Sequence, residues 1–200
     1  MDENQKRTFL YVCSSEALNL HFNNSSGIVR SALCNKRLEE STFSEALERH
    51  KRVFKEIKTG FCFSMSSFVF GILEDMDVQD FYFMESANSM WSNFVILYKT
   101  NEGYRICDLA AQVRKNEEFI GMIMNVDVAE LEKIQKSLKD NHLLCQTIED
   151  YTSHYPIQSC KVLLHKGNED ELYNEVPRMP LNAFLSINEL PSEECTSKHI

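Results

Sequence analysis

The most apolar stretch of the chain begins directly after a glycine. Residues 61–73 (FCFSMSSFVFGIL) carry hydrophobic side chains on every helical face, which is typical of a helix buried on all sides. A glycine before such a run favours a turn, so Gly60 marks the entry to the helix. We therefore predict that a buried helix begins at Cys62.

Three other segments have the spacing of helices. Apolar residues within 41–58 repeat at intervals of three, four and seven, and Thr42 with Glu45 has the spacing of a capping box. We predict one helix there and a less regular one over 8–22. A further capping box at 127–130 predicts a helix over 131–139, and 113–124 is interpreted as a helix or a helix running into a strand.

Short runs of aromatic and β-branched residues predict the strands. They cover 80–84, 93–98, 103–108, 160–165 and 183–187. A turn at 100–102 joins the second and third of these, so the two strands are expected to be adjacent and antiparallel.

This order predicts an α+β fold, in which N-terminal helices, including the cysteine-bearing central helix, pack on an antiparallel sheet of four to five strands. Two hundred residues without an internal repeat or a linker suit a single domain over 1–200. The polar segments 1–7 and 192–200 are expected to be disordered tails.

The net charge of the chain limits the classes of partner that it can bind. The formal net charge of −9 repels nucleic acid and anionic membranes, and it favours a protein or peptide partner with a basic surface. The sequence shows neither a membrane span nor a secretory signal, so we expect a cytoplasmic protein, although delivery into another cell would leave no readable mark. The oligomeric state is not encoded in any visible pattern.

The cysteines suit a reducing compartment. There are seven, an odd number without regular spacing, and no Cys-x-x-Cys or His-x-x-x-His occurs. We therefore expect no zinc site and no cofactor. Cys62 differs from the other six because the unpaired N–H groups at a helix start stabilise a thiolate, although many buried cysteines are simply inert packing.

The sequence from Gly60 to Ala111 resembles the transglutaminase-like and wider papain-like cysteine enzymes. Those proteins have Gly-x-Cys on a helix, then a strand that opens with His, then a strand that closes with Asp. The resemblance implies that Cys62 is the nucleophile and Asp108 the group that orients the base. The position of the family's histidine is taken by Asn93, and an amide cannot accept a proton near neutral pH.

The resemblance implies a cysteine-dependent acyl hydrolase or transferase of the peptidase, deamidase or transglutaminase type. Cys62 would attack the carbonyl carbon, with Asn93 and Asp108 beside it and Phe61 and Trp91 against the substrate. A base would have to come from elsewhere in the chain, and His154 and His165 are the best placed of the candidates. The complete set is His21, His50, His142, His154, His165 and His199.

Two other functions remain open. The chain could be a catalytically inactive binding module on the same scaffold, as the departure at Asn93 and the aromatic residues Phe81, Tyr82 and Phe83 would allow. It could also be a regulatory interaction protein of unrelated fold. The aromatic residues are more common as core than as pocket lining, and His50, on the apolar face of its helix, is more often a packed histidine than a catalytic one.

Overall fold

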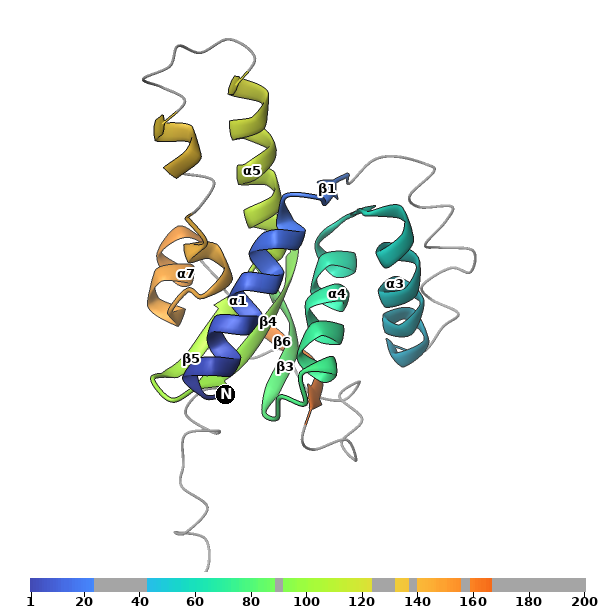
Figure 1. Ribbon diagram of the computed structural model, residues 1–200. Helices are drawn as coiled ribbons and strands as arrows, with labels where there is room; N and C mark the ends of the chain where they lie inside the picture. The colour runs from blue at the N-terminus through green and yellow to red at the C-terminus, as the bar shows by residue number, and fades with distance from the viewer. Residues whose placement is uncertain (24–42, 89–91, 124–131, 137–139, 156–158, 167–200) are drawn as a thin grey trace, which may run out of the picture.

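The computed structural model describes residues 1–23, 43–88, 92–123, 132–136, 140–155 and 159–166 (Figure 1). The helices include α1 (Glu3–Ala17), α3 (Phe43–Ile57), α4 (Cys62–Asp75), α5 (Leu109–Ile123) and α7 (Ile148–His154), with a 3-10 helix η2 (His142–Leu144). Residues 132–136, within the helix predicted over 131–139, are also helical. The strands are β1 (His21–Phe22), β2 (Thr59–Gly60), β3 (Phe81–Ala87), β4 (Ser92–Thr100), β5 (Gly103–Cys107) and β6 (Ser159–Lys166).

A four-stranded sheet in the order β5-β4-β3-β6 forms the centre, and each neighbouring pair is antiparallel. β1 and β2 form a separate parallel pair. The α+β class, the antiparallel sheet and the Cys62 helix start are therefore confirmed. The Cβ alternation of a strand explains why β3 can be buried on both faces.

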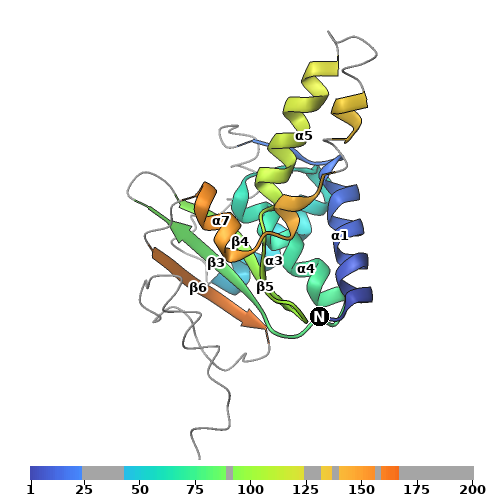
Figure 2. The same ribbon diagram turned by 90° about the vertical axis from the view of Figure 1, so that its left-hand side faces the viewer.

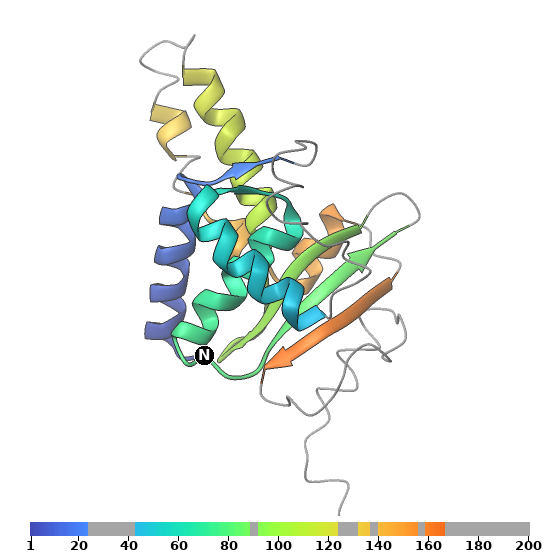
Figure 3. The same ribbon diagram turned by 90° about the vertical axis from the view of Figure 1, so that its right-hand side faces the viewer.

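Helices cover both faces of the sheet. Phe81 and Phe83 belong to a core shared with α1, α3 and α4. Tyr82 and Met84 belong to a second core, which Tyr151 of α7 completes. Figures 2 and 3 show these layers from opposite sides, with α7 in front of the sheet in one and α3 and α4 in front in the other. The aromatic residues 81–83 are thus core, as expected from their type.

The N-terminus departs from the prediction. Helix α1 begins at Glu3 and ends at Ala17, so the helix predicted over 8–22 is present but begins and ends earlier, and the predicted disordered tail over 1–7 is wrong. The cause is a capping box, in which the Asp2 carboxylate accepts from the Gln5 N–H at 2.8 Å and the Gln5 side chain accepts from the Asp2 N–H at 3.0 Å. The Met1 ammonium group also donates to the Lys99 carbonyl at 3.0 Å.

The remaining predictions divide into two groups. Residues 113–123 belong to helix α5, which begins at Leu109, and residue 124 lies outside the described part. Helix α7 was not predicted at all. The capping boxes at Thr42 and 127–130, the strand at 183–187 and the tail at 192–200 lie outside the described residues. Across the described ranges, none of the helices has both the length and the apolar character needed to span a bilayer.

Gly60 and Gly71 form a matched pair for testing the entry to α4. A Cβ on Gly60 would lie 2.7 Å from Cβ of Ser64 and 2.9 Å from Cε2 of Phe54, whereas the nearest atom to a Cβ on Gly71 is the flexible Lys51 side chain at 3.3 Å. We expect Gly60→Ala to lower the free energy of unfolding by about 1–3 kcal/mol. Gly71→Ala should leave it unchanged or raise it by up to about 1 kcal/mol, since alanine favours a helix. Urea denaturation of both variants measures this, and equal losses would contradict it.

Candidate functional site

Cys62 is the first residue of α4. The residue before it, Phe61, is extended (φ −116°, ψ −177°), and its side chain does not cap the helix. Gly60 packs so closely on Ser64 that no larger residue fits, which fixes the turn into the helix. Pairing of Phe22 with Gly60 then brings strand β1 alongside this turn.

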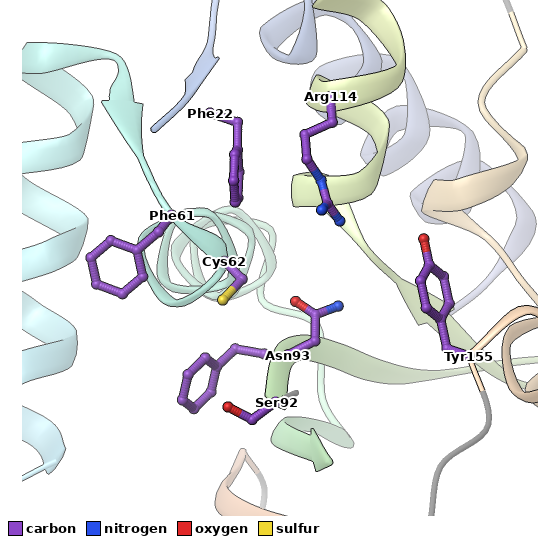
Figure 4. Close-up of a pocket in the computed structure, with 8 residues that line it drawn as sticks. Phe22, Phe61, Cys62, Ser92, Asn93, Arg114 and Tyr155 are labelled. Atoms are coloured by element: carbon purple, nitrogen blue, oxygen red, sulfur yellow. The ribbon is translucent and has the colours of Figure 1, made fainter. Parts of the chain in front are cut away.

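A cavity of about 500 Å³ opens in front of Cys62 (Figure 4). It collects side chains from five parts of the fold, namely β1, the start of α4, the start of β4, α5 and the residue after α7. The lining residues are Phe22, Phe61, Cys62, Ser92, Asn93, Phe94, Arg114 and Tyr155. The arrangement places a thiol, an amide and a guanidinium group at one apolar, largely aromatic opening.

Asn93 lines the cavity and is hydrogen-bonded to two buried residues behind it. Its side-chain nitrogen donates to the Asp108 carboxylate at 2.8 Å and to the Tyr151 hydroxyl at 3.3 Å. Because Asp108 can only accept when ionised, the nitrogen must face it, and the amide oxygen is left on the other side. Figure 4 shows that oxygen turned toward Cys62.

Asp108 directly follows β5 and caps α5. Its Oδ1 accepts from the Ala111 N–H at 2.9 Å, and its side chain is completely buried. Burial raises the pKa of this carboxyl group, while the Ala111 N–H, the Asn93 amide and the positive charge of Arg114 act in the opposite direction. The sequence-based prediction of a buried Asp108 held by Asn93 is therefore confirmed, with Asp108 behind Asn93 rather than in the cavity wall.

The Cys62 thiol is partly buried, and its environment disfavours the thiolate. Burial raises its pKa above the ordinary value, and the negative charge of Asp108 adds to this. The backbone N–H groups of Phe94 and Phe63 and the charge of Arg114 lower the pKa and only partly offset the rise. The helix start therefore does not by itself activate this thiol.

No histidine lines the cavity among the described side chains. His50 is completely buried, its ring packs on Phe61 and Phe63, and its Nδ1 lies 3.0 Å from the Ser64 hydroxyl oxygen. Burial lowers its pKa to about 4, so it is a neutral, packed histidine, as predicted.

The other histidines are placed elsewhere or lie outside the description. His21 contacts Glu117, His142 contacts Asp140, and His154 contacts the Asp150 carbonyl. His165 lies opposite Tyr82 on β3, and Asn93 lies opposite Ser86 on the same strand. Tyr82 and Ser86 are four residues apart, a separation of about 13 Å along the strand. The side chain of His165 and the whole of His199 are outside the described part.

The structure brings Cys62, Asn93 and Phe61 together at one opening, and Trp91 lies outside the described residues. Six residues of the site were missed, namely Phe22, Ser92, Phe94, Arg114, Tyr151 and Tyr155. The two tyrosines could have been found from Thr147 and Asp150, whose spacing is that of a helix cap. The described residues contain no group of three or more His, Cys, Asp or Glu side chains arranged to hold a metal ion.

Removing the Asn93 amide should destabilise the fold in a pH-dependent way. Asn93→Ala leaves a buried carboxylate with one donor fewer, and we expect a loss of about 2–3 kcal/mol in the free energy of unfolding at pH 7.5. The raised pKa of Asp108 means that the folded state binds this proton more tightly than the unfolded state does. The loss should therefore shrink as the pH is lowered, because a protonated Asp108 needs the amide less.

The matched control is Ser92→Ala at the neighbouring exposed position, which should change stability by less than about 0.5 kcal/mol. Urea denaturation at pH 5 and pH 7.5 gives both comparisons. A loss for Asn93→Ala that is the same at both pH values would contradict the role of Asp108.

Comparison of this chain with protein-family models, with curated protein sequences and with solved structures finds no match. The function proposed below therefore rests on the geometry of the cavity.

Proposed function

We propose that the protein is a ligand-binding module on a scaffold like that of the papain-like and transglutaminase-like cysteine enzymes, with the position of the catalytic base taken by an amide. The observation that carries this proposal is the 2.8 Å hydrogen bond from the Asn93 side chain to Asp108, where a thiol enzyme would have an imidazole. An amide donates this bond as an imidazole would, but it cannot take a proton from Cys62.

The state of the thiol supports the same proposal. A cysteine nucleophile needs a substantial thiolate fraction at neutral pH, which enzymes obtain from a neighbouring imidazolium or another positive group. Here burial and Asp108 raise the pKa of Cys62, and Arg114 only partly offsets them. At pH 7 the thiolate is therefore a minor species.

The cavity itself suits binding. Its volume of about 500 Å³ falls within the range of pockets for small ligands, and its walls combine aromatic rings with a few fixed polar groups. The hydrogen bonds to Asp108 and Tyr151 hold the Asn93 amide in one orientation. A ligand would then meet a preorganised acceptor at no further cost in side-chain entropy.

A cysteine-dependent acyl hydrolase or transferase acting on a protein or peptide is the second candidate. Cys62 at the start of α4 favours it, because the N–H groups of Phe94 and Phe63 that act on the sulfur could also stabilise an oxyanion. The two candidates predict different pH dependences for the alkylation rate of Cys62 and different effects of a histidine at position 93.

The first test is the rate of Cys62 alkylation by iodoacetamide between pH 5 and 9.5. We expect the rate constant to rise about tenfold per pH unit, with no plateau below about pH 9, because a raised pKa leaves the thiolate fraction proportional to hydroxide over this range. Peptide mapping by mass spectrometry measures it, with the partly exposed Cys145 as an internal comparison. A rate that is independent of pH from about pH 5 upward would favour the enzyme.

The second test introduces the missing imidazole. We expect Asn93→His to move the pH profile of Cys62 alkylation downward by at least about one pH unit, because an imidazole held by Asp108 can accept the thiol proton. Asn93→Gln is the matched control, since it keeps an amide and adds similar bulk. If the pH profiles of Cys62 alkylation are identical in the two variants, position 93 does not correspond to the position of the catalytic histidine.

A further inference from the structure

The cavity carries a positive charge although the protein as a whole carries −9. Among the described residues that line it, Arg114 is the only one with a charged side chain at neutral pH, apart from the thiolate that Cys62 would form on ionisation. Within the described part of the chain, the Arg114 guanidinium group forms no ion pair, and its recorded contact is with the ring of Phe22, 4.9 Å from the ring centre.

Arg114 is an exposed residue at the opening, and its guanidinium group lies over the ring of Phe22. Phe22 belongs to β1, whose backbone is attached to α5 by a hydrogen bond of 3.1 Å from the Phe22 N–H to the Glu117 carboxylate. The same carboxylate lies 3.3 Å from Nδ1 of His21. Glu117 lies one helical turn after Arg114 on α5. Glu117 therefore binds the backbone of Phe22, and Arg114 lies over the ring of the same residue.

Figure 4 shows the Arg114 side chain reaching down between Cys62 and Tyr155, toward Asn93. The opposite wall offers the Asn93 amide oxygen, which accepts no hydrogen bond from the described residues. The amide nitrogen donates to Asp108 and Tyr151 on the other side. The opening thus presents the Arg114 cation and the Asn93 acceptor, and the hydroxyl-bearing Ser92 and Tyr155 and the aromatic Phe22, Phe61 and Phe94 also line it.

We infer that this cavity binds a monoanionic carboxylate that has an amide N–H and an apolar side group, the chemistry of an N-acylated apolar amino acid, either free or at the C-terminus of a peptide. A guanidinium group pairs with a carboxylate through two parallel hydrogen bonds, and the Asn93 oxygen accepts the ligand N–H. The apolar group packs against the aromatic walls. One cation balances one negative charge, so a dianionic phosphate would leave a charge unpaired beside the buried Asp108.

This inference rests on the proposed binding function and adds the class of ligand. The probes are N-acetyl-phenylalanine, its neutral C-terminal amide and acetyl-Ala-Ala-Phe with a free carboxylate, titrated into the full chain by calorimetry at low ionic strength. We expect both acids to bind at least about tenfold more tightly than the amide, since the ion pair is the main difference. Tighter binding of the longer acid would identify a peptide end as the source, and equal binding a free N-acyl amino acid.

Two variants test the role of the charge. Arg114→Gln should lower the affinity for N-acetyl-phenylalanine about tenfold and remove the preference for the acid over the amide. Lys115→Gln is the control, because Lys115 is the next residue of α5, pairs with Asp140 at 2.9 Å and does not line the cavity. It should retain both the affinity and the preference, and Arg114→Gln behaving like Lys115→Gln would overturn the inference.

Protection of the thiol gives an independent readout. Bound N-acetyl-phenylalanine should slow the alkylation of Cys62 at least about threefold at saturation, as expected when occupancy of the cavity excludes the reagent, and leave Cys145 unaffected. No binding of either acid at millimolar concentration, or equal binding of acid and amide, overturns the inference. A fast, pH-independent Cys62 alkylation together with acid-selective binding would instead overturn the proposed inactive thiol and leave the ligand class standing.

Discussion

The structure around the cavity depends on the burial of one carboxylate. Asp108 is completely inside the protein, where an ion without donors would be far too costly to keep. Its two oxygens are satisfied from different elements, one by the N–H of Ala111 in α5 and the other by the Asn93 side chain of β4. The end of β5, the start of α5 and the start of β4 are therefore held at one point.

The network extends from this carboxylate to helix α7 and strand β3. The Tyr151 hydroxyl on α7 accepts from Asn93 and lies 3.0 Å from the Ser86 hydroxyl on β3. Burial raises the pKa of Tyr151, so it remains a neutral donor and acceptor. The wall of the cavity is consequently held by polar contacts between strands and helices from both layers, which is the kind of support that keeps a binding site preorganised.

The sequence could predict the parts of the site that depend on local pattern. Gly60 and the apolar run after it located the start of α4, and two strands joined by a short turn placed Asn93 beside Asp108. The start of α1 was also readable, since Asp2 and Gln5 have the spacing of a capping box. The residues that follow Asp2 are polar up to Thr8, so no apolar pattern marks this start of the helix.

The rest of the site depends on contacts between residues far apart in the chain. Phe22 lies in a strand of two residues, too short for any periodicity, and its attachment to α5 joins residues 95 positions apart. Arg114 stands in a helix that could be recognised only as part of 113–124, and nothing local indicates that Phe22 will lie beneath its guanidinium group. Such long-range pairings are where single-sequence reasoning has no signal.

Under the proposed function, asparagine at position 93 would preserve the shape of the site without its chemistry. An imidazole and an amide can each donate one N–H to a buried carboxylate, so either satisfies Asp108 and preserves the junction of β4, β5 and α5. Only the imidazole has a second nitrogen that can take a proton from a thiol. The need of the buried Asp108 for a donor and the need of a thiol nucleophile for a base are therefore separable at this position, and the Asn93 side chain meets the first of these needs.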